Sequence, residues 1–377
     1  MAGGAMKTCT RCVMPETAES LDFDATGTCS VCKQQEVKRD VDWTERTRRL
    51  LEISASCRGN ASYDCIVPFS GGKDSTYTLF FAIRRLGLKP LVVRFDHGFL
   101  REGVLDNSRN AFRRLGCDVI HFTPNWHVVK KLMLESLRRR GDFCWHCHTG
   151  VFAYPMQVAV KWKVPLVIWG ENDAEYASWD NGFDTETTHN QERFDRVCNL
   201  GINAEDMAGM VGLGPRDLAC FAYPSAAECA GIRSVFLGNY IPWDSQKQAA
   251  TVKAELGWQG DEVEGVPPQY DYDKIECAMQ GVRDYIKYLK RGFGRTAHLT
   301  SIDVRAGRMT REQAAALTEQ YDGRKPWALF PFLEMLELSE GEFEDIVRDH
   351  TVPPHEFKEG RPQANEAPHD YAEWPSS

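Results

Sequence analysis

The sequence predicts an α/β protein with a doubly wound parallel sheet, preceded by a small cysteine-rich segment and followed by a mostly helical part. Three observations predict this arrangement. Apolar, strand-like runs alternate with helical stretches in the first half of the chain, two Cys-x-x-Cys pairs stand near its start, and helical periodicity dominates beyond residue 245. The 377 residues allow two or three domains with a substantial core.

Composition and charge exclude several classes of protein. With 42% hydrophobic residues, 30 glycines and 18 prolines, the chain is neither collagen-like nor broadly disordered. Its longest apolar runs are too short to span a bilayer, and no charged-then-apolar signal segment opens it, so we expect a soluble, cytoplasmic protein without a membrane partner. The net charge of −9 argues against a nucleic-acid partner.

The N-terminal segment 7–40 carries four cysteines at the spacing of a zinc knuckle. Two Cys-x-x-Cys pairs are separated by 16 residues: Cys9, Cys12, Cys29 and Cys32. Two thiolate pairs on separate turns can close a tetrahedral zinc site, and four protein ligands leave no open position for catalysis. We therefore predict a structural Zn²⁺, because the segment has too few apolar residues to fold without it.

Residues 41–173 show the alternation expected of the parallel sheet. Strand-like runs fall at 65–69, 91–95, 119–122 and 166–169. Helical stretches fall at 41–56, 75–87, 103–115, 126–140 and 150–163. Strands that alternate with helices favour a parallel sheet covered on both faces.

A glycine-rich loop between the first strand and its helix is the strongest functional pattern in the chain. A strand, a glycine turn and a helix start predict an anion site, because backbone N–H groups and the helix dipole favour negative charge there. Hydroxyls and a lysine add further donors. The spacing is not that of a Walker motif. The loop residues are Ser70, Gly71, Gly72, Lys73, Asp74, Ser75 and Thr76.

Two other strand ends carry residues suited to the same ligand. Asp96 and His97 follow the second strand, and Gly170 and Glu171 follow the fourth. Because open α/β sheets bind ligands at the carboxyl ends of their strands, we expect these four residues to face the glycine-rich loop.

A second cysteine cluster, Cys144-Trp145-His146-Cys147-His148, offers two thiols and two imidazoles. Three interpretations stay open at this point: a zinc site, an iron–sulfur cluster completed by Cys220 or Cys229, or structural thiols without metal.

The rest of the chain divides into three further regions. Residues 174–245 lose the α/β alternation and are expected to be an insertion that faces the substrate. Residues 246–350 are mostly helical, with capping boxes beginning at Thr310 and Ser339, and the Pro-rich tail 351–377 is expected to be loosely held. Candidate substrate contacts are Asn239, Tyr240 and Trp243, although core packing explains Trp243 equally well.

The loop resembles, without a mismatch, the SGGxDS signature of the PP-loop ATP pyrophosphatases. Over almost all of residues 7–325, the chain resembles one branch of that superfamily, the N-acetyl sugar amidotransferases of bacterial surface-polysaccharide (LPS O-antigen) biosynthesis. Beyond the loop, the blocks that carry this resemblance are Cys9–Pro15, Cys144–His148, Trp169–Glu171, Tyr240–Asp244, Tyr288–Arg295 and Asp303–Arg308.

The resemblance implies a reaction and its cofactors. ATP and Mg²⁺ would adenylate the acetamido group of a nucleotide-linked N-acetyl sugar, and ammonia would then displace AMP to leave an acetamidine. Lys73 would stabilise charge on the departing pyrophosphate, and Asp74 would help to hold Mg²⁺. No glutaminase motif is visible in the chain, so the ammonia would come from a separate glutaminase subunit, with a cyclase-like protein as a candidate channel.

Two other functions stay open. The first is a PP-loop tRNA-thiolating enzyme, in which Cys144, Cys147 and Cys220 would hold an iron–sulfur cluster; the acidic net charge argues against it. The second is a non-catalytic zinc-knuckle scaffold that docks a glutaminase. The intact glycine-rich loop argues against the scaffold, because a scaffold has no need of an ATP site.

Overall fold

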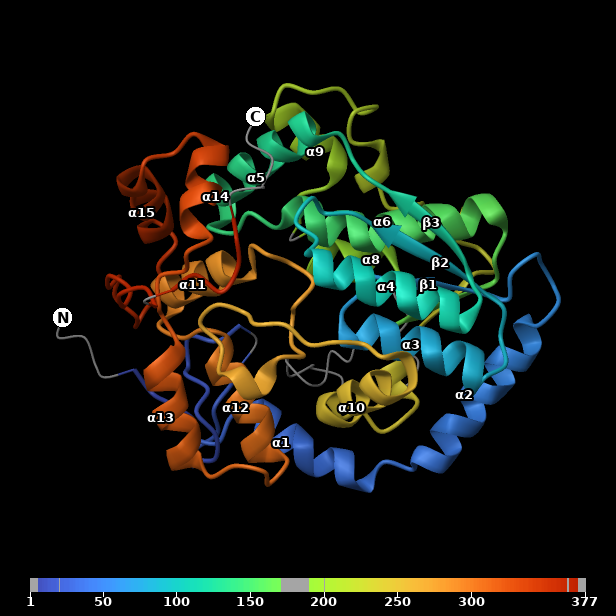
Figure 1. Ribbon diagram of the computed structural model, residues 1–377, viewed down its shortest axis with the longest axis horizontal. Helices are drawn as coiled ribbons and strands as arrows, with labels where there is room; N and C mark the ends of the chain where they lie inside the picture. The colour runs from blue at the N-terminus through green and yellow to red at the C-terminus, as the bar shows by residue number, and fades with distance from the viewer. Residues whose placement is uncertain (1–5, 20, 171–189, 200, 365, 372–377) are drawn as a thin grey trace.

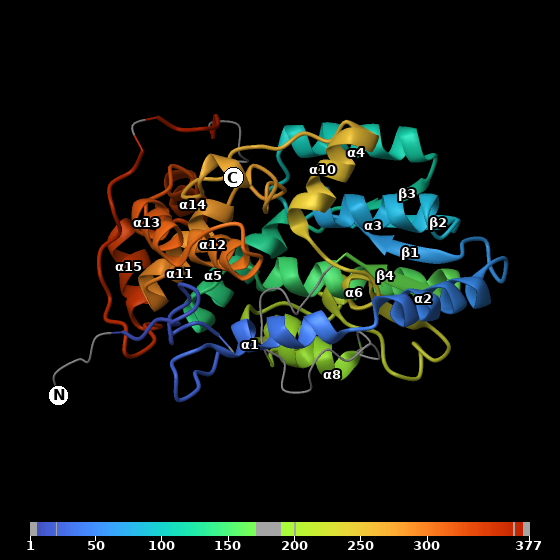
Figure 2. The ribbon, with the colours of Figure 1, turned by 90° about the horizontal axis from the view of Figure 1, so that it is seen from below.

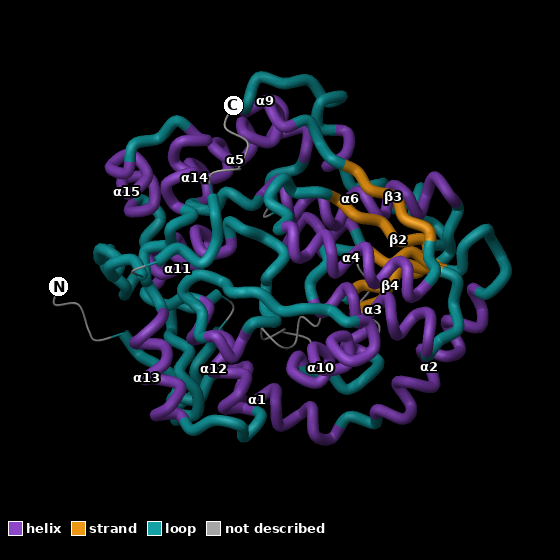
Figure 3. Tube along the Cα trace, viewed as in Figure 1, coloured by secondary structure: helices purple, strands orange, loops and turns teal. Residues whose placement is uncertain are grey.

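The structure, a computed structural model, describes residues 6–19, 21–170, 190–199, 201–364 and 366–371, and its strands gather on one side of the molecule (Figure 1, Figure 3). The strands are β1 (Cys65–Pro68), β2 (Pro90–Phe95), β3 (Asp118–Phe122), β4 (Leu166–Trp169) and β5 (Arg233–Phe236). They form one sheet in the order β3-β2-β1-β4-β5, and all neighbours are parallel. This order confirms the predicted doubly wound sheet. The fifth strand was not predicted, because it lies in the region assigned to an insertion.

Both faces of the sheet are buried, which explains why its strands are continuous apolar runs. In β1, Cys65 and Val67 belong to one core cluster and Ile66 to another on the opposite face. In β4, Ile168 belongs to the first of these clusters and Val167 belongs to the second. Successive side chains of a strand point to opposite faces, so every position of these strands contributes to a core.

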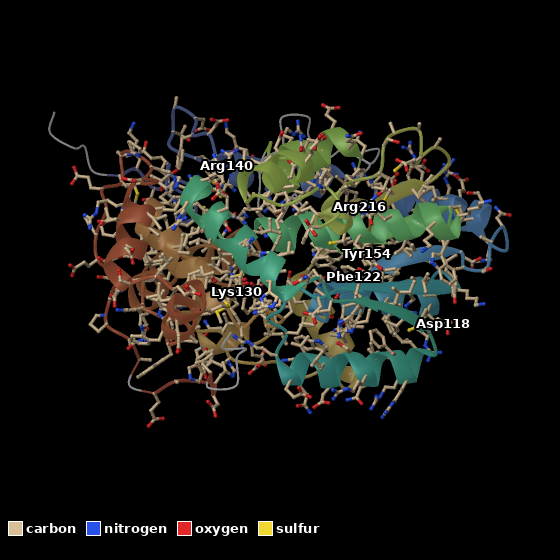
Figure 4. The ribbon with its side chains drawn as sticks, turned by 90° about the horizontal axis from the view of Figure 1, so that it is seen from above. Asp118, Phe122, Lys130, Arg140, Tyr154 and Arg216 are labelled. Atoms are coloured by element: carbon tan, nitrogen blue, oxygen red, sulfur yellow. The ribbon has the colours of Figure 1, made fainter. Side chains whose placement is uncertain are left out.

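Helices cover the two faces as separate layers (Figure 2). On one side lie α3 (Lys73–Arg84), α4 (Glu102–Leu115) and α10 (Ser245–Leu256), and on the other lies α6 (Trp145–Trp162). At the end of β3, Phe122 stacks on Tyr154 of α6 with ring centroids 4.3 Å apart (Figure 4). Helix α6 begins five residues before the predicted 150–163 stretch, because the Cys144–His148 cluster forms its first turn.

The C-terminal helices pack together as a group beside the sheet (Figure 1). They are α11 (Gln280–Arg291), α12 (Arg295–Arg305), α13 (Arg311–Tyr321), α14 (Leu329–Leu336) and α15 (Glu340–Arg348). Both capping boxes are confirmed, at Thr310 and at Ser339. Helix α5 (Trp126–Arg140) packs against α11, α14 and α15 through a common core cluster. That cluster joins the two parts of the molecule.

Shorter elements complete the chain. The remaining α-helices are α1 (Ser30–Val37), α2 (Trp43–Cys57), α8 (Gln191–Arg193) and α9 (Ala204–Met210). Single turns of 3-10 helix occupy Lys38–Asp40, Ala219–Phe221, Leu237–Asn239 and Pro268–Tyr270, and a π-helical turn occupies Phe194–Cys198. In the described ranges, no helix combines the length and apolar character needed to cross a bilayer.

The cysteine-rich N-terminal segment docks onto the C-terminal helices. Its four thiols share a core cluster with Phe293, Ala297 and Ala314. The guanidinium of Arg311, the first residue of α13, donates to the carbonyl oxygens of Cys9 and Cys12, each at 3.1 Å. The first and last thirds of the sequence are therefore neighbours.

The tail differs from its prediction. Instead of lying loosely, its described part is tied to the C-terminal helices by backbone hydrogen bonds. Val352 N–H donates to Lys290 at 2.8 Å, and Arg361 exchanges two bonds with the 323–325 turn, at 2.7 and 3.0 Å. Farther on, the Tyr371 hydroxyl donates to Glu264 at 2.6 Å. Pro-rich composition misled the prediction, because tertiary hydrogen bonds can hold a chain that has no helix or strand of its own.

Candidate active site

A cavity of about 340 Å³ opens where β1, β2 and β4 end. Phe69 and Ser70 line it from β1, His97 from β2, and Trp169 and Gly170 from β4. After β1 the chain adds β2 and β3 on one side of it, and then it adds β4 and β5 on the other side. The cavity therefore lies at the topological switch point of the sheet. The opposite wall is the segment 274–283, which leads into α11.

The N–H groups of the glycine-rich loop form hydrogen bonds with hydroxyls of the loop itself. The N–H groups of Ser70 and Gly71 both donate to the Ser75 hydroxyl, at 3.3 and 3.1 Å, and Gly72 N–H donates to the Ser70 hydroxyl at 3.3 Å. Ser70, Gly72, Asp74 and Ser75 line the cavity directly. Donors that converge on one oxygen at a helix start are suited to a phosphate oxygen in the same place.

Three glycines of the site are required by close packing. Gly71 has a φ of +95°, and a Cβ there would lie 2.5 Å from Val104. A Cβ on Gly72 would lie 2.7 Å from a carboxylate oxygen of Glu276. At Gly170 a Cβ would meet the backbone of Asp74 at 2.9 Å, so the end of β4 lies directly against the first turn of α3. A Cβ at Gly72 would press on the facing wall, whereas one at Gly71 would press on α4 and one at Gly170 on α3.

Lys73 and Asp74 form a charged group behind the loop with a third residue, Asp273. The Lys73 ammonium lies 2.9 Å from Asp74 and 3.3 Å from Asp273, and it sits 5.6 Å from the centre of the Tyr272 ring. Burial disfavours the Asp273 carboxylate, but the charges of Lys73 and Arg295 outweigh burial and lower its pKa. Burial raises the pKa of Asp74 despite the opposing charge of Lys73.

Several buried polar atoms around the loop have no hydrogen-bond partner in the protein. They are Asp74 Oδ1, Thr76 Oγ1, His97 Nε2 and Asp273 Oδ1. Buried polar groups are rarely left without partners, so atoms of this kind mark a place where a ligand belongs. Of the residues that carry these atoms, Asp74 and His97 line the cavity, and the Asp74 carboxylate is of the type that Mg²⁺ prefers. The residues present therefore fit ATP with Mg²⁺.

The residues after β2 divide into two roles. His97 lines the cavity and is only 4% exposed, and burial lowers its pKa to about 4, so its ring is neutral at pH 7. Asp96 does not line the cavity. Its carboxylate accepts from Gly98 N–H at 2.8 Å and from the Thr123 hydroxyl at 3.4 Å, which shapes the turn that presents His97.

The three predicted substrate contacts lie in different surroundings in the structure. Trp243 lines the cavity and packs edge-on against Tyr77, with ring centroids 6.1 Å apart. Tyr240 is 5% exposed and packs in the core cluster on the α3 face, outside the cavity lining. Asn239 also lies outside the cavity lining, and its carbonyl accepts from Arg46 of α2 at 3.0 Å. Glu171 and residues 174–189 of the predicted insertion lie outside the described residues.

The four N-terminal cysteines converge as predicted. Their sulfur atoms all lie within 4.8 Å of one another, and all four side chains are buried. Backbone N–H groups of Arg11, Cys12 and Cys29 point at the sulfur of Cys9, at 3.4, 3.5 and 3.2 Å. Four thiolates in this arrangement fit a tetrahedral Zn²⁺, and the N–H groups would stabilise the thiolate charge.

The second cysteine cluster gains a partner that sequence reasoning missed. Cys144 and Cys147 line the cavity together with Cys277, from the segment before α11. The predicted partners lie elsewhere: Cys220 packs in a cluster around Phe95 and Trp145, and the Cys229 thiol faces the carbonyl of Pro224 at 3.7 Å. The structure therefore does not place either Cys220 or Cys229 in the cavity with Cys144 and Cys147.

Other side chains of the cavity were also missed. Lys274, Glu276, Gln280 and Arg283 line it from the C-terminal side, and Arg94 lies buried behind the loop with its guanidinium over the Phe69 ring. One weak signal was available in the sequence, the charged run that contains Lys274 and Glu276 just before a helix. Nothing in its spacing relates it to a loop 200 residues earlier.

Comparison with known proteins finds a family match in the C-terminal part. Residues 265–367 match the family model of the LPS biosynthesis protein WbpG-like C-terminal domain. A GMP synthase (glutamine-hydrolysing) of Pyrobaculum aerophilum is 33% identical over 86 residues, which is 23% of this chain and 16% of that protein. An uncharacterised protein of Methanocaldococcus jannaschii is 23% identical over 141 residues, 37% of this chain and 50% of that protein. The chain thus matches half or less of these relatives.

Two solved structures align with much of the chain at low similarity. An NMN synthetase from Francisella tularensis has 14% identity and a TM-score of 0.39, covering 75% of this chain and 93% of that one. The U34-tRNA thiolase NcsA from Methanococcus maripaludis, solved with its 4Fe–4S cluster, has 13% identity and a TM-score of 0.32, covering 84% and 89%. At these TM-scores neither structure bears on the function of this chain.

Proposed function

Since residues 265–367 match the model of the WbpG-like C-terminal domain of LPS biosynthesis proteins, we propose that the chain is an ATP-dependent sugar amidotransferase. It converts the acetamido group of a nucleotide-linked N-acetyl sugar to an acetamidine, in bacterial surface-polysaccharide (LPS O-antigen) biosynthesis. AMP and pyrophosphate are the other products. The ammonia comes from a separate glutaminase subunit, with a cyclase-like protein as candidate channel.

One observation carries this proposal. The glycine-rich loop at the switch point of the sheet faces a cavity whose other wall begins inside the WbpG-like domain, at Lys274. The loop is suited to phosphate, and the facing wall belongs to a domain of polysaccharide biosynthesis. A single cavity therefore joins features of ATP chemistry to features of that pathway.

The proposed reaction has two steps. The acetamido oxygen attacks the α-phosphorus of ATP, the bond to the β-phosphate oxygen breaks, and pyrophosphate leaves. Ammonia then adds to the carbon of the adenylated imidate, and AMP departs with the original oxygen, so the product carries C=NH in place of C=O. Adenylation is needed because the oxygen of an amide is a poor leaving group.

The residues of the loop have distinct roles in this scheme. The N–H groups of Ser70, Gly71 and Gly72 bind the departing pyrophosphate, and they exchange their present bonds to serine hydroxyls for bonds to phosphate. Lys73 moves from its carboxylate partners toward the developing charge. Asp74, with Asp273 behind it, would hold Mg²⁺, which when bound offsets charge on the phosphates. Trp243 and the Trp169–Phe152 ring pair offer apolar surface for the base or the sugar.

A direct assay tests the proposal. Purified protein is mixed with ATP, Mg²⁺, ammonium chloride and a panel of uridine- and thymidine-diphosphate N-acetyl hexosamines, and pyrophosphate release is followed. We expect release that depends on one of the sugars, with a product in which mass spectrometry finds oxygen replaced by NH. Glutamine without a partner should not replace ammonium. Pyrophosphate release that no sugar stimulates would contradict the proposal.

One observation favours a second candidate, a thiolating enzyme that acts on tRNA. The cavity holds three cysteines, which an amidation does not require. The same assay separates the two, with tRNA and a sulfide source replacing the sugar and ammonium. A non-catalytic scaffold, the third alternative, would release no pyrophosphate with any substrate.

A further inference from the structure

Three cysteines of the cavity form a group that the proposed amidation leaves without a role. Cys144 and Cys147 come from the start of α6, and Cys277 comes from the segment before α11. All three line the same cavity as the glycine-rich loop. We propose that Cys144, Cys147 and Cys277 hold an iron–sulfur cluster at the edge of this cavity.

The backbone around the three cysteines is held firmly. Cys144 caps α6, and its N–H donates to the Asp142 carboxylate at 2.7 Å. Cys277 pairs with Leu100 in an isolated bridge, and the next residue, Ala278, donates to Phe99 at 3.0 Å. The two segments are thus tied to common elements near the end of β2. A preformed arrangement of ligands is what a bound metal centre requires.

The imidazole of His146, between Cys144 and Cys147, already has hydrogen-bond partners. His146 is 1% exposed, and its ring nitrogens lie 3.3 Å from the Phe143 carbonyl and 3.2 Å from the His97 carbonyl. These contacts hold α6 against the end of β2. His148 lines the cavity together with the thiols, so this edge offers three sulfurs and one imidazole. The sulfurs are the donor type that iron–sulfur clusters and other soft metal centres take.

The distances between sulfur atoms distinguish a site for an iron–sulfur cluster from a site for a single zinc ion. Around one Zn²⁺, bonds of about 2.3 Å bring tetrahedral thiolates to roughly 3.8 Å from one another. The N-terminal knuckle has this geometry, with sulfur pairs at 3.8 and 3.9 Å. Within the described ranges, only the knuckle brings three or more Cys, His, Asp or Glu ligand atoms within 4.8 Å of one another. The three cavity cysteines do not form such a group. A single zinc ion would require that spacing, whereas a cluster, with iron and sulfide between the thiolates, would not.

The charges nearby suit an anionic centre. Arg283 and Lys274 line the same cavity, and Arg283 is held 3.6 Å from the Asp142 carboxylate. Three thiolates with a cluster carry net negative charge, which these two cations offset. Among the described residues the cavity lining supplies three cysteines, so a four-iron cluster held here would have one iron without a thiolate ligand.

The inference is tested on the full chain, purified without oxygen and, in parallel, reconstituted with ferrous iron and sulfide. Iron, acid-labile sulfide and zinc are measured together with the visible spectrum. We expect about four iron atoms per chain with a broad visible band, in addition to about one zinc from the knuckle. Cys277→Ser should lower the iron content at least fivefold, and Cys147→Ser should do the same.

Matched variants make the outcome specific. Cys220→Ser changes a thiol that is half-buried like Cys277 but lies outside the cavity, and it should retain the full iron content. Cys9→Ser should lose zinc and keep iron. Lys73→Met should keep the cluster, so a failure of ATP chemistry and an absence of the cluster are read separately. Circular dichroism of each variant confirms that it has folded.

Three results would overturn the inference. The first is wild-type protein that takes up no iron and sulfide after reconstitution. The second is equal iron in Cys277→Ser, Cys147→Ser and the wild type. The third is a second zinc ion that Cys277→Ser removes, which would replace the cluster by a mononuclear site.

Discussion

The two walls of the cavity are built in different ways. The sheet wall consists of short segments at strand ends, and its glycine-rich loop is continuous in sequence from Ser70 to Thr76. The facing wall, from Lys274 to Arg283, reaches the cavity only because the C-terminal helices pack beside the sheet. The sheet wall offers backbone N–H groups, hydroxyls and aromatic rings, whereas the facing wall offers charges and a thiol. A glycine-rich loop encoded locally thus faces side chains that only long-range packing brings to the cavity.

The largest effect should come from the zinc knuckle, which packs against the C-terminal helices that follow the facing wall. Cys9→Ser removes one of four zinc ligands, so the knuckle loses its metal and the helices α12 and α13 lose the surface on which it docks. We expect zinc to fall from about one per chain to background, with a stability loss above about 4 kcal/mol. Metal analysis and limited proteolysis measure this, with Cys229→Ser as the control. Unchanged zinc content would refute the knuckle.

The next largest effect should come from the sheet wall. Lys73→Met keeps most of the side-chain volume. It removes the positive charge that, in the proposed reaction, stabilises the departing pyrophosphate. We expect ATP-dependent pyrophosphate release to fall by about 100- to 1,000-fold, comparable to the loss of one preorganised donor. Lys131→Met, on the exposed face of α5, serves as the control and should leave release unchanged. Near-normal release by Lys73→Met would remove the loop lysine from the mechanism.

A double-mutant cycle measures how strongly the two walls are joined. Asp273 is 1% exposed and lies 3.3 Å from Lys73, so Asp273→Asn removes a buried charge partner. We expect a loss of about 1–3 kcal/mol in the free energy of unfolding, and a smaller loss when Lys73 is already Met. Urea unfolding of the four proteins gives the coupling energy. Additive losses would mean that the two walls meet without an energetic link.

The smallest effect should be a pH dependence at the junction of the walls. Burial lowers the pKa of His97 to about 4, whereas the unfolded chain titrates near 6.5. Between these values the unfolded state binds more protons, so the free energy of unfolding falls as pH falls, by up to about 1.4 kcal/mol per pH unit. His97→Gln should reduce this slope. Urea unfolding at pH 7, 5.5 and 4.5 tests it, with exposed His127→Gln as the control; an unaltered slope would contradict it.

The sequence by itself determined the features whose signals lie within a few residues. Strand ranges, the glycine-rich loop and both capping boxes depend on local periodicity and spacing, and the structure places them where the sequence predicts. The four knuckle cysteines likewise converge as their spacing requires. Local backbone geometry decides such features, so they can be read from the chain before its packing is known.

Only the tertiary structure decided which distant residues share the cavity. It selected Cys277 instead of Cys220, placed Tyr240 in the core, and added β5 from a region without regular alternation. It also brought Asp273 to Lys73 across 200 positions. These outcomes depend on how helices pack against a sheet, and a single sequence holds no local signal for contacts that form only when the whole core is assembled.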